Sequence, residues 1–257
     1  MGQCTDPEAG DPSQEPGPTC DVQVFLARPD QQDERDLDQA WTLLDAHERA
    51  QADRFYFASD RLTYVVAHGL LRSVLARHAG KQGAELRFLR TRFGRPELDG
   101  SEGGRDRIRF SLSHSRGLVG CAVTLAVDVG LDVEAARRPA PLDVAERYFA
   151  EKELSWLRAR LPPEQDDWFY ALWTLKEAYM KGVGLGLALP LQSFGVQPTP
   201  EGSARLLLPH PEQTEPGPWT LRWWRLERHW TALAVRAPAN NVRIELFQDH
   251  RIKASGL

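Results

Sequence analysis

Apolar residues recur every three or four positions in the first long stretch of the chain, beginning at Leu37 and continuing to Leu75. This spacing places one apolar stripe along an α-helix and predicts a helical region over residues 33–79. Gly80 follows the last periodic positions and is typical of a helix end. A short apolar segment over residues 22–27 precedes the helices and predicts a strand.

From residue 108 to residue 114 the spacing changes to strict alternation. Ile108, Phe110 and Leu112 occupy every second position, so they face one side of a strand while the polar residues between them face the other. This part of the chain is therefore predicted to be sheet. Two further apolar segments predict strands over residues 118–127 and 127–133.

The second half of the chain repeats this order, with helices first and strands after them. Helical spacing predicts two helices, separated at Pro162 and Pro163, and three later apolar segments predict strands, the first two forming a hairpin. Helices that precede strands in two successive halves indicate an α+β fold. The predicted helices cover residues 143–160 and 166–182, and the predicted strands cover 219–225, 230–236 and 242–247.

The expected domain organisation follows from this division near residue 128. Residues 21–128 form an N-terminal α+β half and residues 129–250 a C-terminal α+β half. Residues 1–20 are rich in Pro, Gly and acids without apolar periodicity, so we expect a disordered N-terminal tail there. Residues 251–257 are expected to form a C-terminal tail.

The composition excludes several classes of protein. The 257 residues are 42% hydrophobic and 26% charged, as in ordinary globular proteins, and no apolar run approaches the ~20 residues of a membrane helix. The arginines are spread along the chain without a dense basic run, so neither nucleic acid nor membrane is an expected partner. Cys4, Cys20 and Cys121 make no disulfide framework and no secretion signal is recognisable, so we expect a cytoplasmic protein.

Two carboxylates share one face of the strand that begins the second half. Residues 130–134 read Gly-Leu-Asp-Val-Glu, and side chains two positions apart lie roughly 6–7 Å from each other on one side of a strand. Asp132 and Glu134 therefore repel each other unless a cation lies between them, and Mg²⁺ prefers such oxygen ligands. Gly130 leaves room for another group to approach. The alternative interpretation is a strand edge with two solvated acids.

The helix predicted over residues 166–182 carries a glutamate and a lysine in line with a tryptophan. Trp173, Glu177 and Lys181 are four residues apart and form one stripe. A Glu–Lys pair at this spacing is usually a surface ion pair, but aromatic residues surround this one in the sequence. A carboxylate in that setting can complete a metal site, and Lys176 and Lys181 can bind phosphate.

The strand over residues 108–114 ends in hydroxyl and imidazole groups. Residues 110–115 read Phe-Ser-Leu-Ser-His-Ser, so Ser113 and His114 offer hydrogen-bond donors suited to a phosphate. A serine hydrolase needs its nucleophile on a strained turn such as G-x-S-x-G, which is absent. A polar strand end with capping hydroxyls is the alternative interpretation.

In this order and at these distances, the segments resemble one family, the 4′-phosphopantetheinyl transferases of the Sfp type. The family combines a G-x-D-x-E strand, a W-x-x-K-E-A-x-x-K helix, an F-S-L-S-H-S strand and a G-K/R-P element. In this chain they stand at residues 130–134, 173–181, 110–115 and 94–96, and the resemblance covers about residues 22–247. A basic-aromatic segment of the family is matched loosely by Arg54-Phe55-Tyr56 and Arg61.

The resemblance implies an α+β fold of two similar halves related by a pseudo-twofold axis, with an active-site cleft between them that binds coenzyme A. It implies transfer of the 4′-phosphopantetheine arm from coenzyme A to a serine of an apo acyl or peptidyl carrier protein, which yields the holo carrier and 3′,5′-ADP. Two fused halves would supply a complete cleft, so a monomer is expected. The carrier is expected to contact residues 137–149, whose basic and apolar groups suit an acidic, hydrophobic carrier helix.

The resemblance also implies roles for the residues of the predicted metal site in the C-terminal half. Asp132, Glu134 and Glu177 would hold Mg²⁺ on the pyrophosphate of coenzyme A. Glu177 would be the base for the attacking serine, directly or through water. Lys181, with Lys176 beside it, would neutralise or protonate the departing phosphate.

The same resemblance implies contacts for the nucleotide end of coenzyme A. Arg95, Ser113 and His114 would contact the phosphoadenosine. Family members often carry a further basic residue near the position of Thr63 to bind the 3′-phosphate. Because Thr63 is neutral, Arg54 or Arg61 is expected to take that role.

Two other functions fit part of these observations. A different Mg²⁺-dependent phosphoryl-transfer enzyme could use the same carboxylates, but it gives no reason for the Ser-His and Arg-Pro elements. A degenerate module that binds coenzyme A or carriers without turnover is expected to have lost Asp132, Glu177 or Lys181. All three are present.

Overall fold

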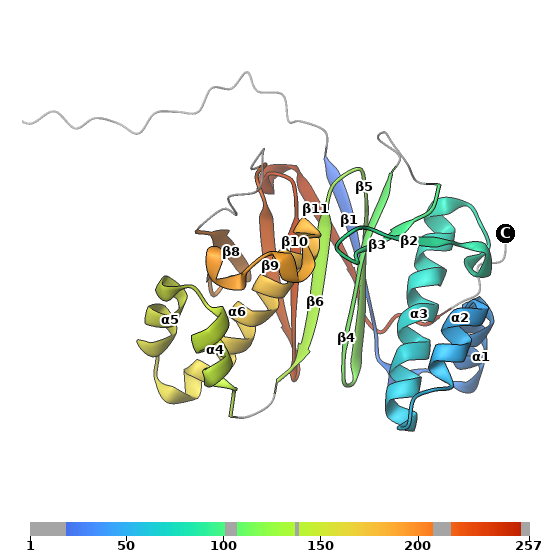
Figure 1. Cartoon of the computed structure of the whole chain (residues 1–257), viewed down its shortest axis with the longest axis horizontal. Helices are drawn as coiled ribbons and strands as arrows, with labels where there is room; N and C mark the ends of the chain where they lie inside the picture. The colour runs from blue at the N-terminus through green and yellow to red at the C-terminus, as the bar shows by residue number, and fades with distance from the viewer. Residues whose placement is uncertain (1–18, 101–106, 137–138, 208–216, 253–257) are drawn as a thin grey trace, which may run out of the picture.

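Two β-sheets face each other in the middle of the molecule, and helices cover the outer face of each (Figure 1). This computed structural model describes residues 19–100, 107–136, 139–207 and 217–252. Buried side chains form one core under each helical layer and another between the sheets. The α+β fold predicted from the sequence is confirmed.

The N-terminal half combines one sheet with three helices. The sheet has the strand order β11-β1-β5-β4. Its strands are β1 (Cys20–Ala27), β4 (Ile108–Ser115), β5 (Leu118–Leu125) and β11 (Val242–Phe247), and the helices are α1 (Glu34–Leu43), α2 (Ala46–Ala52) and α3 (Ala58–Ala79). A separate hairpin of β2 (Phe88–Arg90) and β3 (Pro96–Leu98) follows α3.

Local capping explains why the predicted helical region over residues 33–79 divides into three helices. Asp33 and Asp45 each accept a hydrogen bond from the backbone N–H three residues on, and these capping boxes begin α1 and α2. Helix α3 ends at Gly80, whose left-handed backbone (φ 61°) is the conformation that glycine favours. The predicted end of the helical region is confirmed.

The C-terminal half combines a second sheet with three more helices. The sheet has the strand order β6-β10-β9-β8-β7. Its strands are β6 (Val129–Ala135), β7 (Val196–Pro198), β8 (Ser203–Leu206), β9 (Thr220–Leu226) and β10 (His229–Val235), and the helices are α4 (Leu142–Tyr148), α5 (Glu151–Arg158) and α6 (Pro162–Val183). No helix in the described part of the chain is long and apolar enough to cross a membrane.

The predicted break between two helices is present, because α5 ends at Arg158, but Pro162 and Pro163 belong to the helix that follows. They lie in the first turn of α6, where the missing N–H of proline costs little because the first N–H groups of a helix have no helical acceptor. The helix predicted over 166–182 therefore starts earlier than expected. The helix predicted over 143–160 is two shorter helices, α4 and α5.

The last strand of the chain joins the sheet of the N-terminal half. β11 pairs parallel with β1, with Cys20 opposite Val242. Beyond it, Ile252 is fully buried in the core under α3, so the predicted C-terminal tail begins with packed residues. The rest of the two predicted tails, residues 1–18 and 253–257, lies outside the described residues.

A fully buried arginine joins the helices of the N-terminal half. Arg72 of α3 donates to the carboxylates of Asp45 and Glu48, at 2.6 Å each, and to two backbone carbonyls beyond α3. Burial raises the pKa of Glu48, but the hydrogen bonds with His68 and Arg72 outweigh it and hold that pKa below its usual value.

This carboxylate should make the fold sensitive to acid. The pKa of Glu48 is lower in the folded than in the unfolded protein. The ionised carboxylate therefore contributes its full stabilisation of the fold above the unfolded pKa of about 4.3, and this stabilisation is lost as the pH falls through the folded pKa. The Tm difference between the wild type and Glu48→Gln should therefore narrow between about pH 5 and pH 3. Thermal unfolding followed by circular dichroism measures it, and a constant difference would contradict the expectation.

Candidate active site

The two halves meet at the edge strands β4 and β6. Each is the last strand of its sheet, so its outward backbone groups have no strand partner within that sheet. Serine hydroxyls of β4 replace that partner: Ser111 Oγ accepts from the N–H of Leu131 at 2.9 Å, and Ser113 Oγ accepts from the N–H of Val133 at 3.2 Å. The apolar face of β4 points into the core under α3, so the predicted alternation is confirmed.

Helix α6 packs on β6 with its backbone in direct contact. A Cβ atom on Gly130 would lie 1.9 Å from the carbonyl oxygen of Ala178 and 2.3 Å from the nitrogen of Gly182. No other residue fits at such a distance, so the room that Gly130 leaves is filled by the helix itself. This close approach brings the polar stripe of α6 over the carboxylates of β6.

Asp132, Glu134, Glu177 and Lys181 gather between β6 and α6, and we call them the carboxylate cluster. Lys181 Nζ donates to Asp132 Oδ1 at 2.6 Å and to Ser113 Oγ at 2.9 Å. The Ser113 hydroxyl in turn donates to the same Asp132 oxygen at 2.9 Å. The predicted metal ligands and the predicted phosphate-binding lysine thus come together in one place.

Trp173 completes the stripe at the other end of the cluster. Its Nε1 donates to Oε1 of Glu134 at 3.1 Å. Since Lys181 contacts Asp132 two turns further along α6, the stripe of Trp173, Glu177 and Lys181 faces β6 as its spacing predicts.

The carboxylates of the cluster perturb one another. Burial and the charge of Asp132 raise the pKa of Glu134 to about 7 and that of Glu177 to about 7. Lys181 opposes both shifts without cancelling them. Three carboxylates beside one lysine leave an excess of negative potential that a bound cation would offset.

One oxygen of Asp132 supports a cation at this position. Its Oδ2 is buried and has no hydrogen-bond partner among the described residues, which is costly for a carboxylate. The described residues contain no group of three or more His, Cys, Asp or Glu side chains already arranged as metal ligands. Mg²⁺ needs few protein ligands, because it keeps several waters and takes substrate phosphates as ligands. Asp132, Glu134 and Glu177 fit that requirement.

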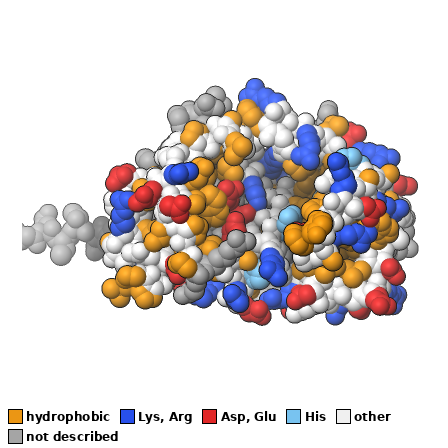
Figure 2. All heavy atoms as spheres, turned by 60° about the horizontal axis from the view of Figure 1, so that its bottom comes forward, with side chains coloured by type: hydrophobic (Ala, Val, Ile, Leu, Met, Phe, Trp, Pro, Cys, Tyr) orange, Lys and Arg blue, Asp and Glu red, His pale blue; other side chains and the backbone are white. Residues whose placement is uncertain are grey.

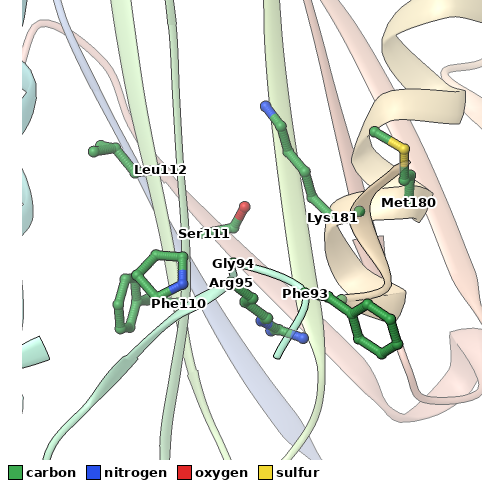
Figure 3. A pocket seen from close by; sticks show the side chains of 11 residues that line it. Phe93, Gly94, Arg95, Phe110, Ser111, Leu112, Met180 and Lys181 are labelled. Atoms are coloured by element: carbon green, nitrogen blue, oxygen red, sulfur yellow. The ribbon is translucent and has the colours of Figure 1, made fainter. Parts of the chain in front are cut away.

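Two cavities open beside the cluster. The hairpin cavity, about 260 Å³, lies between the β2–β3 turn, β4 and the end of α6, with Arg95 and Lys181 in its wall (Figure 3). The large cavity, about 900 Å³, has His114, Glu134 and Trp173 in its wall. Residues of both halves line each cavity, so the predicted cleft is present. The face shown in Figure 2 is hollowed near its centre, with acidic, basic and histidine side chains around the hollow.

The serine and histidine at the end of β4 have different surroundings. His114 lines the large cavity, where burial and the charge of Lys181 lower its pKa and favour the neutral imidazole. Ser113 is buried and lines neither cavity; its hydroxyl holds Asp132 and Lys181. The structure therefore gives Ser113 a positioning role.

Lys176 does not lie beside Lys181, which corrects its expected place in the site. Five residues along an α-helix correspond to a rotation of about 140°, so the two lysines leave α6 in different directions. Lys176 is fully buried, and its Nζ donates to Glu153 Oε2 at 2.6 Å and to the carbonyl of Phe194 at 2.7 Å. Lys176 thus ties helix α6 to helix α5 and to the segment that follows α6.

Removing this lysine should destabilise the fold rather than weaken ligand binding. Lys176→Met leaves Glu153 buried without its ion pair, which should lower the free energy of unfolding by about 3–5 kcal/mol. Adding Glu153→Gln removes the unpaired charge and should restore part of that loss. Urea unfolding measures the stability. Wild-type stability combined with lost coenzyme A binding would restore Lys176 to the site.

Arg95 joins the two halves from the wall of the hairpin cavity. Its guanidinium donates to the carbonyls of Gly182 at 2.9 Å and Val129 at 3.2 Å, and it lies near Asp128. These contacts fix the β2–β3 turn against the C-terminal half. Most hydrogen bonds of the Arg95 guanidinium are therefore used to hold the cavity wall together.

The other two arginines expected to bind coenzyme A line neither of these two cavities. Arg61 pairs with Asp53 at 3.1 Å and stacks over the ring of Trp41, so it faces α1. Arg54 is exposed and lines neither the hairpin cavity nor the large cavity. The structure does not bring these two residues to the carboxylate cluster.

Several cavity residues could not be found from motifs. Phe93, Met180 and Gly184 line the hairpin cavity, and Phe169 and His229 line the large one. They come from the β2–β3 turn, from helix α6 and the residue after it, and from the start of β10, which only the packing of the two halves brings together. Their residue types carry no signal of their own.

Comparisons with known proteins agree with this arrangement. Residues 128–234 match the family described as the 4′-phosphopantetheinyl transferase superfamily, and residues 30–126 match one described as 4′-phosphopantetheinyl transferase, N-terminal. The 4′-phosphopantetheinyl transferase Sfp of Bacillus subtilis (strain 168) is 32% identical over 72% of this chain and 80% of that protein. The 4′-phosphopantetheinyl transferase HetI of Nostoc sp. is 36% identical over 77% of this chain and 81% of that protein.

A solved structure was also found, that of the holo-[acyl-carrier-protein] synthase of Thermotoga maritima. It is 24% identical, with a TM-score of 0.36, over 44% of this chain and 64% of that chain. The sequence matches decide the assignment, and they show a transferase. The chain belongs to the 4′-phosphopantetheinyl transferase superfamily and is of the Sfp type.

Proposed function

We propose that the protein transfers the 4′-phosphopantetheine arm of coenzyme A to a serine of an apo acyl or peptidyl carrier protein, with Mg²⁺ as cofactor and 3′,5′-ADP as second product. The observation that carries this proposal is the carboxylate cluster with Lys181 between two cavities. A pyrophosphate at the cluster would have its nucleotide end in the hairpin cavity. The carrier would then approach from the large cavity. A cytoplasmic monomer is part of the proposal.

Asp132, Glu134 and Glu177 would hold the Mg²⁺. Their mutual repulsion and the unpartnered Oδ2 of Asp132 support this assignment. When bound, the ion would offset the charge that develops on the leaving phosphate. Lys181 already holds Asp132 in place and would add its own charge beside the same phosphate.

The protein's own groups can move the proton that this transfer requires. The serine oxygen forms a bond to the phosphorus that carries the pantetheine arm, and the bond from that phosphorus to 3′,5′-ADP breaks. A serine hydroxyl is a poor nucleophile until a base takes its proton. Glu177 lies between Trp173 and Lys181 on the stripe that faces β6, and we assign it as this base, directly or through one water.

The carrier is proposed to dock at the mouth of the large cavity beside α4. This helix exposes Leu142 and Tyr148, two large apolar side chains that suit the apolar face of a carrier helix. Arg137 and Arg138, proposed to contact acidic residues of the carrier, lie outside the described residues.

Mass spectrometry of carrier proteins tests the proposal. Apo carriers of fatty-acid, polyketide and nonribosomal-peptide synthesis are incubated with the protein, coenzyme A and Mg²⁺. We expect at least one carrier to gain the mass of one phosphopantetheine while 3′,5′-ADP is released, and we expect chelation of Mg²⁺ to stop both. No mass gain on any carrier would favour a module that binds without turnover.

A further inference from the structure

The chain crosses from the N-terminal half to the C-terminal half through three residues, Ala126, Val127 and Asp128. They connect β5, which belongs to one sheet, to β6, which belongs to the other (Figure 1). Ala126 has a left-handed backbone (φ 64°), which is unfavourable for a residue with a Cβ atom and persists only where the surroundings hold it. Its N–H donates to the carbonyl of Arg107 at 2.8 Å. The crossover is therefore held in one geometry.

Asp128, the last residue of this crossover, holds arginines from both halves. Arg109 of β4 and Arg95 of the β2–β3 turn pair with its Oδ1, and Arg236, which follows β10, pairs with its Oδ2 at 3.5 Å. The backbone carbonyl of Asp128 also accepts from the N–H of Arg236 at 2.9 Å. One carboxylate thus joins the N-terminal sheet, the hairpin and the C-terminal sheet at a single point.

A second carboxylate continues this network into the hairpin. Glu97 of β3 accepts from Arg107 and from Arg109, at 2.6 Å each. Arg109 therefore donates to Glu97 and to Asp128 at once, and its side chain is only 10% exposed. Because little water reaches this guanidinium, its contacts with the two carboxylates are weakly screened. The hairpin is thus fixed through β3 as well as through its turn.

Arg95 depends on these two carboxylates. Burial and the charge of Arg109 lower the pKa of Arg95 to about 10, while Asp128 and Glu97 oppose that shift. Without the charge of Asp128, Arg95 and Arg109 would repel each other beside one remaining carboxylate. Arg95 is the residue that fastens the β2–β3 turn to two backbone carbonyls of the C-terminal half. Loss of that charge would therefore loosen the turn that forms a wall of the hairpin cavity.

We propose that Asp128 is a positioning residue for coenzyme A, because through Arg95 and Arg109 it fixes the wall of the hairpin cavity against the C-terminal half. Asp128 does not line that cavity, so it acts through the arginines and not on the ligand. The inference rests on the proposed function, which places the nucleotide end of coenzyme A in the hairpin cavity. A fixed wall favours affinity, since less freedom of the protein is lost when the ligand binds.

Asp128→Asn tests this role, since asparagine keeps the shape of the side chain and removes its charge. Titration calorimetry should show that the Kd of coenzyme A rises about 3–30-fold, the range in which residues without ligand contact modulate binding. With a carrier that the wild type modifies, the KM for coenzyme A should rise by the same factor. kcat should stay within about twofold, because the contacts among Lys181, Asp132 and Ser113 do not involve Asp128. Asp128→Glu, which keeps the charge, should recover part of the affinity.

Hydrogen exchange of the free protein reports the state of the cavity wall directly. The N–H of Thr91 donates to the carbonyl of Arg95, and the N–H of Gly94 donates to the carbonyl of Thr91, at 2.9 Å each. Both amides should exchange faster in Asp128→Asn than in the wild type, while the amides of helix α3 should not. This measurement needs neither coenzyme A nor a carrier. Failure of the proposed function would show instead as a wild type that modifies no carrier, so the two failures are distinguishable.

Glu227→Gln is the matched control, because it breaks another carboxylate–arginine pair between the two halves, that of Glu227 with Arg28 at 3.2 Å. It should keep the wild-type Kd of coenzyme A and the wild-type exchange of the hairpin. Arg109→Gln should weaken binding as Asp128→Asn does, and it carries the test should Asp128→Asn not fold. The double variant should bind no more weakly than the weaker single variant. The inference is overturned if Asp128→Asn keeps the wild-type Kd or hairpin exchange, if Glu227→Gln has the same effects, or if the two single effects add.

Discussion

Asp132→Ala is expected to abolish transfer while leaving the binding of coenzyme A largely intact. One oxygen of this carboxylate is held by Lys181 and Ser113, and the other is buried and available to a cation. The substitution removes a proposed metal ligand and the partner of Lys181 together. We therefore expect kcat to fall by at least about 10³-fold, since a metal ion contributes several kcal/mol of transition-state stabilisation. The walls of the two cavities stay in place, so the Kd of coenzyme A should rise much less.

The rate of carrier modification as a function of Mg²⁺ concentration measures this effect, with calorimetry for the binding of coenzyme A. Glu201→Ala, which removes an exposed carboxylate beyond β7, serves as control and should behave as the wild type. Activity that survives in Asp132→Ala with an unchanged Mg²⁺ dependence would show that the metal binds elsewhere.

Residue spacing predicted which side chains share a face, and this part of the site could be found from the sequence. A period of two put Asp132 and Glu134 on one side of β6, and a spacing of four put Glu177 and Lys181 on one side of α6. Both patterns are local, because backbone geometry within one element decides them. That the two faces meet depends on Gly130, whose missing side chain lets α6 approach β6.

Contacts between distant segments could not be predicted in the same way. Lys176 and Arg61 have the charge that a phosphate site needs, and both stand in or near family motifs. Their partners, Glu153 and Trp41, belong to other helices. The contacts with these partners hold the two side chains outside the hairpin cavity and the large cavity. The hydroxyl of Ser113 is a donor of the kind that binds phosphate. Because β4 packs against β6, this hydroxyl donates to Asp132 instead.

The topology shows the same limit at the level of whole elements. The strand over residues 242–247 was predicted at its observed bounds. Its pairing with β1, which lies more than two hundred residues earlier in the chain, was not predicted. Parallel pairing between the two ends of a chain leaves no turn sequence to indicate it. Arg95 stands in the turn of a short hairpin, and only the docking of that hairpin against the C-terminal half brings it to a cavity.

Glu177→Gln should separate the two roles proposed for this residue. Glutamine keeps the shape of the side chain and one carbonyl oxygen for a cation, but it cannot accept the proton of the attacking serine. If Glu177 is the base, the variant should still bind coenzyme A with Mg²⁺ and lose about 10²–10⁴-fold in kcat, the usual contribution of general base catalysis. Since the base acts as the carboxylate, we expect the wild-type rate to fall toward low pH, and this fall should disappear in the variant.

Single-turnover measurements, with the protein in excess over a limiting carrier, give the rate constant of the transfer step without product release. Glu177→Asp provides the matched control. Aspartate retains the base one methylene further back, so it should keep the fall in rate toward low pH and recover part of the lost rate. A near-normal kcat for Glu177→Gln with an unchanged acidic limb would leave Glu177 at most a metal ligand. In that case the neighbouring groups argue for a water as the base, because Lys181 is engaged with Asp132 and Glu134 with Trp173.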